Sequence, residues 1–194
     1  MRALSFLQPW LHAVLRLGKN VENRTWQPPQ AMIGQVFALH ASKGWDKHGE
    51  AFIRDRWPEE FGAFPDRILT RGAIVGLARL RGWARVEGDD LDLFDHGVAK
   101  LIGSKGTDHQ AIIKSPWFFG PYGWLLDDVF KLEQSVPCKG ALGFWDMPQD
   151  VETEVALQLL EPGWQNGAEL VVMSAEIKQD GRIIVHPLVK RPVV

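Results

Sequence analysis

The chain has 194 residues, of which 45% are hydrophobic and 24% are charged, and its formal net charge at pH 7 is −2. This length suits one core with an appendage, and the balanced charge excludes a uniformly basic nucleic-acid-binding surface. Any nucleic-acid site must therefore be a local basic patch. Nine tryptophans beside a single tyrosine supply many flat rings on which nucleobases can stack.

The use of cysteine and the distribution of apolar residues bear on the compartment. Cys138 is the single cysteine, which excludes an intramolecular disulfide, and we interpret it as a structural residue. Gln8, Pro9 and His12 interrupt the apolar N-terminus, so we expect no signal peptide. No apolar run approaches the length of a membrane span. The sequence therefore predicts a cytoplasmic protein that does not enter the membrane.

The N-terminal part of the chain predicts a strand, a helix and a second strand in succession. Residues 3–7 form the first strand, and Pro9 suits the first position of the helix. Gly18 is well placed to end that helix in a left-handed cap. The helix carries a broad apolar stripe formed by Trp10, Leu11, Val14, Leu15 and Leu17.

An unusual group of charges follows Gly18. If this stretch is extended, alternate side chains share a face, because the side-chain period of a strand is two. One face then carries Glu22, Arg24 and Trp26, and the other carries Val21, Asn23 and Thr25. We predict that the face with the charges looks into a pocket.

The middle of the chain predicts further strands and one more helix. The apolar runs with strand character are residues 35–41, 72–80, 125–132 and 136–145. Two glycines within 72–80 indicate a bulge or a close backbone approach. A helix is predicted over residues 44–61, packing through Trp45, Phe52, Ile53 and Trp57. Residues 81–113 predict irregular structure, including an acidic run at 87–95 that lacks the pattern of a calcium loop.

Residues 115–124, Ser-Pro-Trp-Phe-Phe-Gly-Pro-Tyr-Gly-Trp, place aromatic side chains among prolines and glycines. Composition leaves two interpretations open, a plug in the core or a wall on which bases stack. Near the C-terminus, residues 151–160 predict a helix, and a hairpin is predicted from 170–178 and 182–189 around Asp180-Gly181. Pro187 indicates that the second strand of this hairpin is an edge.

Several short strands, a helix near the N-terminus and no alternating βαβ pattern predict an α+β fold built on a small mixed β-barrel with flanking helices. We expect a first domain over residues 1–148. Residues 149–194 form a C-terminal extension, a helix plus a hairpin, expected to pack on the barrel.

The stretch Gly18-Lys19-Asn20-Val21-Glu22-Asn23-Arg24 resembles the signature of the ASCH domain, a branch of the PUA-like superfamily of small β-barrels. Lys19, Glu22 and Arg24 keep the family spacing, although many members place one residue between the glycine and the lysine. Further segments that resemble the family are residues 8–10, 39–43, 72–76 and 115–124. The resemblance implies a PUA-like fold with a cleft between barrel and helices that binds RNA or a nucleotide.

The residue types suggest how such a cleft would work. Lys19 and Arg24 are cations suited to a phosphate, and Glu22 between them suits a hydrogen-bond acceptor or a general base. Trp10, Trp117 and Tyr122 are candidates for stacking a base. The other candidate binding residues are Trp26, His40, Ser42, Lys43 and Ser115. The alternative is a purely structural Glu22–Arg24 salt bridge that holds barrel to helix.

Three functions remain open. The first is a binding module for RNA or a modified nucleotide, with no cofactor. The second is a single-strand ribonuclease, as described for some bacterial proteins with a similar 115–123 segment, using Lys19 and Glu22 and, if needed, a divalent metal. We expect no dedicated metal site. The third, which we favour least, is amide hydrolysis of N4-acetylcytidine, because Glu22 stands where small ASCH amidohydrolases have a threonine nucleophile and Thr25 is offset.

Overall fold

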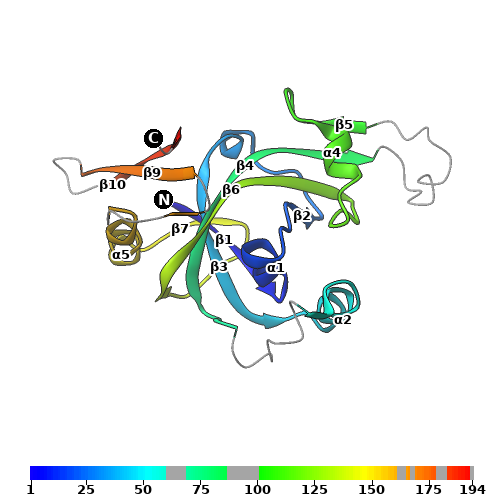
Figure 1. The fold of residues 1–194 in the computed structure, drawn as a ribbon, viewed down its shortest axis with the longest axis horizontal. Coiled ribbons are helices and arrows are strands. Elements are labelled where there is room, and N and C mark those ends of the chain that lie inside the picture. Colours follow the sequence, from blue (N-terminus) through cyan, green and yellow to red (C-terminus); the bar gives the residue numbers. More distant parts are fainter. Residues whose placement is uncertain (60–68, 87–100, 161–164, 167–168, 178–182, 193–194) are drawn as a thin grey trace.

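The computed structural model describes residues 1–59, 69–86, 101–160, 165–166, 169–177 and 183–192. The fold is α+β, and its main feature is a curled mixed sheet that forms a half-barrel (Figure 1). The strands of this sheet are β1 (Arg2–Gln8), β2 (Val21–Arg24), β3 (Val36–Trp45), β4 (Ala73–Val86), β5 (Leu101–Gly103), β6 (Tyr122–Pro137) and β7 (Phe144–Asp146). The described helices are α1 (Trp10–Arg16), the 3-10 turn η1 (Gln30–Met32), α2 (Lys47–Arg56), α4 (His109–Ile113) and α5 (Gln149–Leu160).

The strand order is β2-β6-β4-β3-β1-β7, with β5 attached to β4. The first strand pairs with β3 in parallel, and the other neighbours are antiparallel. The long strands β4 and β6 change register three times along their contact, and such bulges increase twist and bend a sheet. A Cβ at Gly76 would lie 2.4 Å from the Phe130 carbonyl oxygen, which confirms the predicted close backbone approach in β4.

Side chains on the inner face of the curled sheet form the main core. Leu4 and Phe6 of β1 meet Phe37 and Leu39 of β3 there, and Trp124 of β6 is fully buried among them. A second cluster joins α5 to the other side of the sheet through Val151, Val155 and Leu159. A third cluster lies between α1, α2 and the aromatic segment before β6.

The strand, helix and second strand predicted near the N-terminus are present, although Pro9 precedes the first residue of α1 and β2 ends at Arg24, before Trp26. Strand β1 leads into α1 at Pro9, and the glycine after the helix has a positive φ of 69°. The Lys19 N–H donates to the Ala13 carbonyl across this cap at 3.1 Å, so the turn at Gly18 is held against the last turn of the helix. The cap turns the chain directly into β2, where Glu22 and Arg24 share one face.

The helix predicted over residues 44–61 begins later than expected. Strand β3 continues through Trp45, and α2 starts at Lys47. The Asp46 side chain caps the helix by accepting from the N–H groups of His48 and Gly49. An aspartate in this position fixes a helix start because it satisfies N–H groups that have no partner within the helix.

The prediction of irregular structure over residues 81–113 is wrong at both ends of that range. Strand β4 runs to Val86, and β5 and α4 follow at Leu101 and His109. Ser104 stabilises the turn between them, because its hydroxyl accepts from the Trp83 N–H and contacts the Thr107 hydroxyl at 2.8 Å. The acidic run at 87–95 lies outside the described residues.

The two strands predicted at 125–132 and 136–145 are also wrong in their bounds. A single strand, β6, runs from Tyr122 to Pro137, and β7 covers only Phe144–Asp146. The polar residues Glu133, Gln134 and Ser135 look like a break in the sequence, but they are exposed within the strand. They lie at a register shift between the β4 partners of Lys131 and Val136, and the Gln158 side chain of α5 accepts from the Gln134 N–H at 2.9 Å and donates to the Gln134 carbonyl oxygen at 3.0 Å.

The C-terminal part contains α5 and a second sheet. This sheet has the order β10-β9-β8, with β8 at Gln165–Asn166, β9 at Glu169–Ile177 and β10 at Ile183–Pro192. The predicted hairpin is confirmed, although its Asp180-Gly181 turn lies outside the described residues. Strand β10 is an edge, and its register shifts between His186 and Val189, around Pro187.

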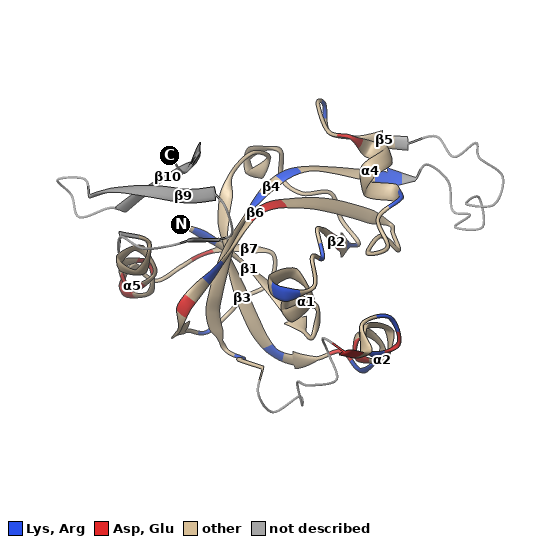
Figure 2. Cartoon of the chain, in the orientation of Figure 1, with Lys and Arg blue, Asp and Glu red and all other residues tan. Residues whose placement is uncertain are grey.

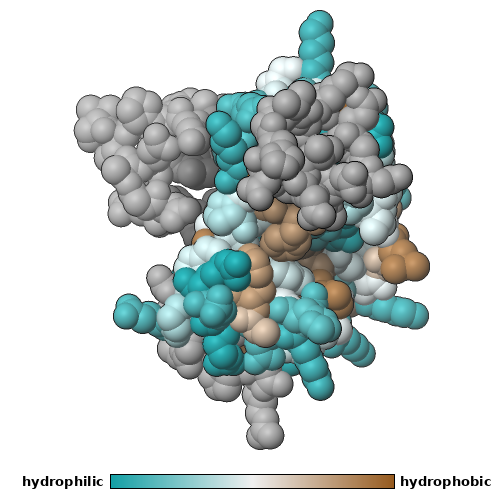
Figure 3. Space-filling model, turned by 90° about the vertical axis from the view of Figure 1, so that its right-hand side faces the viewer, coloured by the Kyte–Doolittle hydropathy of each residue, from teal (hydrophilic) through white to brown (hydrophobic). Residues whose placement is uncertain are grey.

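Charged residues of both signs are spread along the described chain, and α2 carries both (Figure 2). On the side turned to the viewer in Figure 3, hydrophobic residues lie near the centre and at the right edge, and hydrophilic residues lie beside and below the central ones. Among the described residues, the helices are all too short or too polar to cross a membrane.

Candidate functional site

The structure contains a cleft of about 300 Å3 beside the turn from α1 into β2. We call it the charged cleft. Its lining residues come from β1, α1, β2, the cap of α2 and the aromatic segment before β6: Ser5, Leu7, Trp10, Lys19, Glu22, Asn23, Arg24, Asp46 and Phe119. Of the predicted site residues, the structure therefore brings four together here: Trp10, Lys19, Glu22 and Arg24.

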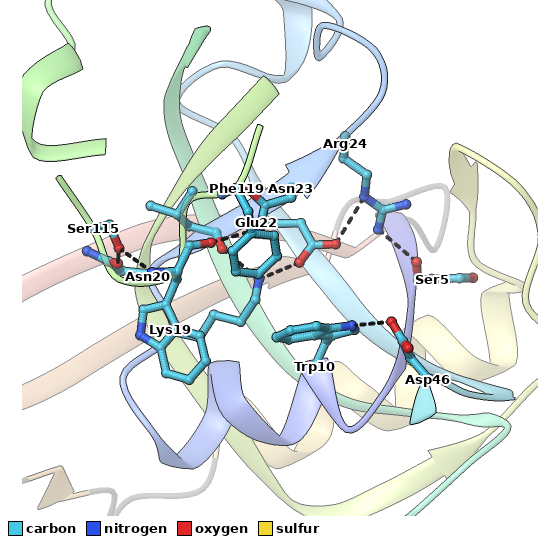
Figure 4. A network of polar contacts seen from close by, with 12 residues as sticks. Ser5, Trp10, Lys19, Asn20, Glu22, Asn23, Arg24, Asp46, Ser115 and Phe119 are labelled. Carbon is cyan, nitrogen blue, oxygen red and sulfur yellow. Dashed lines mark hydrogen bonds and ion pairs between the residues drawn. The ribbon is translucent and has the colours of Figure 1, made fainter. Parts of the chain in front are cut away.

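The base of the charged cleft is a continuous row of ionic contacts (Figure 4). Lys19 Nζ donates to Glu22 Oε2 and to the Val21 carbonyl oxygen, both at 2.6 Å. The other carboxylate oxygen, Oε1, lies 3.1 Å from Arg24 Nε, close enough for an ion pair but not aligned for a hydrogen bond. Arg24 Nη2 donates to the Ser5 carbonyl oxygen at 2.9 Å. Glu22 thus bridges the two cations.

Lys19 is the most deeply buried charge in this row, with 1% of the residue exposed. Burial lowers the pKa of its ammonium group and nearby Arg24 lowers it further, whereas the Glu22 carboxylate opposes both effects. Lys19 is therefore enclosed, and its contact with the rest of the row is through Glu22. Arg24 is the more accessible cation, with 20% of its side chain exposed.

Trp10 and Phe119 border the charged row, and we call this pair the aromatic wall. The Trp10 ring lies 5.4 Å from the Phe119 ring at an interplanar angle of 44°, and 41% of Phe119 is exposed. The Trp10 Nε1 donates to Asp46 Oδ2 at 2.8 Å, which fixes the ring against the start of α2. A Cβ on Gly49 would lie 2.5 Å from the Trp10 ring, so α2 packs closely behind it.

Asn23 holds the aromatic segment in place. Its Oδ1 accepts from the Phe119 N–H at 3.0 Å, and its Nδ2 donates to the Trp117 carbonyl oxygen at 2.7 Å. Strand alternation assigned Asn23 to the face away from the pocket, yet it lines the cleft, because the segment that it binds forms part of the cleft wall.

Sequence reasoning missed five lining residues: Ser5, Leu7, Asn23, Asp46 and Phe119. The pattern of an aspartate before a helix is a signal that could have placed Asp46 at a cap, and so near the preceding strand end. The contacts of Ser5, Leu7 and Phe119 depend on tertiary packing that carries no local signal.

Three aromatic candidates lie away from the charged cleft. Trp117 is 3% exposed and stacks on Trp57 at 4.0 Å, so it belongs to the core. Trp26 packs edge-on against Trp124 at 4.6 Å, because β2 ends at Arg24 and the strand alternation does not continue. Tyr122 packs against the Trp83 ring at 5.5 Å.

The polar candidates outside the motif are also displaced from the cleft lining. His40 is 2% exposed, and its ring contacts the Ser5 hydroxyl at 3.1 Å and the Cys138 carbonyl oxygen at 3.3 Å, one layer behind the cleft. Ser42 Oγ is buried, and Lys43 is exposed beside Gly72. The predicted Ser115 hydroxyl donates to Asn20 Oδ1 at 3.1 Å.

Three other features that bear on catalysis are the position of Thr25, the possible metal ligands and the state of Cys138. Thr25 is exposed after the end of β2 and is not among the described lining residues. Within the described part of the chain, no group of three or more His, Cys, Asp or Glu residues is placed to hold a metal ion. Burial raises the pKa of the Cys138 thiol, which fits its interpretation as a structural residue.

No protein-family model matches the chain, and no curated protein matches it.

Proposed function

We propose that the protein binds single-stranded RNA or a nucleotide in the charged cleft. The observation that carries this proposal is that an aromatic pair, the half-buried Trp10 and the exposed Phe119, shares one cleft with the Lys19–Glu22–Arg24 row. A nucleotide offers the matching chemistry, because it joins a flat base to an anionic phosphate.

The aromatic wall would hold the base. Stacking of a base on an aromatic side chain contributes about 1–3 kcal/mol and tolerates any base. Phe119 supplies the accessible ring, and the hydrogen bond to Asp46 keeps Trp10 in a fixed orientation. A wall that is already ordered reduces the entropy lost on binding.

The ionic row would hold the polar parts of the ligand. A guanidinium group has five N–H donors in a planar fork, and Arg24 directs one to Ser5 and its Nε toward Glu22, which leaves the others for a phosphate. A carboxylate has about four lone-pair positions, so Glu22 can accept from a base amino group while it keeps Lys19 and Arg24. Lys19 then serves as the buried support of Glu22.

The resemblance of residues 18–24 to the ASCH signature supports the same function, because that family is associated with RNA and nucleotide binding. Lys19, Glu22 and Arg24 are the residues that carry the resemblance, and all three line the charged cleft. We therefore propose that the chain is an ASCH-type, PUA-like protein.

A single-strand ribonuclease is the second candidate, and the state of Lys19 favours it. The pKa of Lys19 is lowered and its Nζ lies 2.6 Å from Glu22. General acid–base cleavage of a phosphodiester requires one group that takes the proton of the attacking hydroxyl and one that gives a proton to the leaving oxygen. Glu22 would be the group that faces the substrate, with Lys19 in contact behind it. Arg24 would then stabilise negative charge that develops on the phosphate.

The binding proposal is tested by fluorescence anisotropy of a labelled single-stranded RNA with wild type and Phe119→Ala. We expect Phe119→Ala to weaken binding by about tenfold, since one stack is lost. Leu157→Ala is the matched control, because Leu157 is 58% exposed on α5 and lies outside the cleft. Equal affinity of Phe119→Ala and wild type would remove the aromatic wall from the proposal.

The ribonuclease candidate is tested by incubating the same RNA with the protein, with and without divalent metal. Cleavage that disappears in Lys19→Met, in a variant whose circular dichroism matches wild type, would support catalysis at this site. Binding without cleavage would exclude the ribonuclease and support the proposal that the protein only binds RNA. Undiminished cleavage by Lys19→Met would exclude the lysine as a catalytic residue.

A further inference from the structure

A second cavity of about 280 Å3 lies on the other side of α1. It shares no lining residue with the charged cleft: its residues are Gln8, His12, Leu15, Arg16, Leu69, Thr70, Val75, Lys131, Leu132, Glu133 and Ser135. Trp10 of the cleft and His12 of this cavity are two positions apart on α1, about 200° around the helix. The two sites therefore open in different directions.

The floor of the second cavity is polar and ordered. Gln8 is 3% exposed and His12 is 6% exposed. The Gln8 side chain accepts from the His12 backbone N–H at 3.1 Å and donates to the Thr70 carbonyl oxygen at 3.0 Å. These hydrogen bonds fix the junction of β1 and α1 beneath the cavity.

The rim of the cavity carries two cations from different elements, Arg16 of α1 and Lys131 of β6. Among the described residues neither cation is paired with a carboxylate, although Glu133 of β6 also lines the cavity. Burial and both cations lower the pKa of His12 to about 4, and burial and Arg16 lower the pKa of Lys131. The two cations of the rim thus lie near each other, and neither is neutralised by an ion pair with a carboxylate among the described residues.

We propose that the second cavity is a binding site for a phosphate group, held between Arg16 and Lys131 over the floor of Gln8 and His12. A phosphate brings the negative charge that the rim lacks, and Arg16 can bind it through two parallel hydrogen bonds. The exposed hydroxyls of Thr70 and Ser135 are further donors at the mouth. Two ligands could supply this phosphate group: a free phosphate ion, or the backbone of a nucleic acid.

The site is tested by following the His12 ring signals by NMR while inorganic phosphate, or in a second arm a short single-stranded RNA, is titrated at constant ionic strength. We expect either probe to raise the pKa of His12, since an anion offsets the positive rim. Arg16→Gln and Lys131→Gln should each weaken phosphate binding by about tenfold, as expected for a lost charge-assisted hydrogen bond. Lys114→Gln, on an exposed cation at the end of α4, should bind as wild type does.

Each outcome of this test is decisive. A response to inorganic phosphate that Arg16→Gln and Lys131→Gln weaken supports the site with free phosphate as a sufficient ligand. A response to RNA alone, with the same dependence, supports it with backbone phosphate as the ligand. No response to either probe, or equal binding by the variants and Lys114→Gln, overturns it. Phe119→Ala should leave the His12 response unchanged, which separates this site from the function proposed for the charged cleft.

Both rim side chains are exposed, so their removal should leave the fold intact. The His12 signals check this without ligand. Loss of either cation should itself raise the pKa of His12, because each cation lowers it in the wild type. A variant with an unchanged His12 pKa would show that its cation does not face the cavity, and this too would overturn the proposal.

Discussion

At the scale of single residues, Glu22 makes the burial of Lys19 possible. A buried ammonium without a counter-charge is costly, and Glu22 supplies that charge while it also binds Arg24. The Lys19–Glu22–Arg24 row can therefore stabilise the fold and still offer groups to a ligand. The structural interpretation of the Glu22–Arg24 pair and the ligand-site interpretation are compatible, since a paired carboxylate keeps lone pairs toward the cleft.

We expect Glu22→Gln to destabilise the fold by roughly 3 kcal/mol, because it leaves Lys19 buried beside a neutral amide. The free energy of unfolding in urea measures this loss. Glu50→Gln is the matched control, since Glu50 pairs with the exposed Arg54 on the surface of α2. Surface pairs contribute under about 1 kcal/mol. Equal losses in the two variants would contradict the buried role of Glu22.

His12 predicts a dependence of stability on pH. Its pKa is lowered from 6.5 to about 4 in the folded protein, so between these values the unfolded chain binds more protons. Stability should therefore fall as pH is lowered from 6.5 toward 4. His12→Gln should make this fall shallower in urea unfolding, whereas His48→Gln, at an exposed position on α2, should not. If the free energy of unfolding fell equally with pH in wild type and His12→Gln, the prediction would be contradicted.

The residues of the site were predictable only where they are close in sequence. Lys19, Glu22 and Arg24 follow from the cap at Gly18 and the alternation of an extended chain. Phe119 and Asp46 lie far along the sequence and reach the cleft through the packing of other elements. For the same reason Trp117 looked like a stacking residue, although its position against Trp57 makes it part of the core.

At the scale of elements, Asp46 connects α2 to the cleft. It caps α2 through two backbone N–H groups and also accepts from Trp10 Nε1. The start of the helix and the orientation of the aromatic wall are therefore set by one carboxylate. Burial by itself would raise the pKa of Asp46, but its hydrogen bonds, of which that from the Gly49 N–H is the strongest, together lower it.

We expect Asp46→Ala to destabilise the protein by about 1–2 kcal/mol and also to weaken RNA binding, because Trp10 loses its partner. Asp108→Ala is the matched control. Asp108 caps α4 through the Ala111 N–H and lies outside the cleft lining, so its loss should cost stability without affecting binding. Unfolding in urea and RNA anisotropy distinguish the two variants. Equal RNA affinities in both variants would contradict the proposed link.

The errors in element bounds have a common physical cause. Residues 81–86 and 133–135 look irregular locally because of their charged and polar side chains. The first stretch is strand because it pairs with β6 and β5. The second lies at a register shift opposite β4, where the Gln158 side chain of α5 hydrogen-bonds the main chain of Gln134. Local propensity is a weak guide for strands, since pairing partners decide them.

At the scale of the whole molecule, α5 shares a core with the sheet, although the sequence suggested a boundary near residue 148. Val151, Val155 and Leu159 lie in one hydrophobic cluster with Leu77 and Phe130. The helical period placed these residues on one face of α5, and the extension was expected to pack on the barrel, but the sequence did not indicate which residues of the sheet the face would cover. The α+β class and the curled sheet were predictable from the short apolar runs.

We expect Val155→Ala to lower the free energy of unfolding by roughly 2 kcal/mol, because Val155 is fully buried between α5 and the sheet. Leu157→Ala on the same helix should change it by under about 0.5 kcal/mol, since Leu157 is 58% exposed. Urea unfolding followed by circular dichroism measures both. If the two variants were equally stable, α5 would be a loosely attached appendage.

Asn23 has a consequence for the redesign of the protein. It binds the main chain at Phe119 and Trp117, so it positions residue 119 without any demand on the side chain there. The exposed ring at 119 can thus be exchanged for another while its attachment point stays fixed. Position 119 is a natural place at which a library of side chains would alter ligand preference and spare the fold.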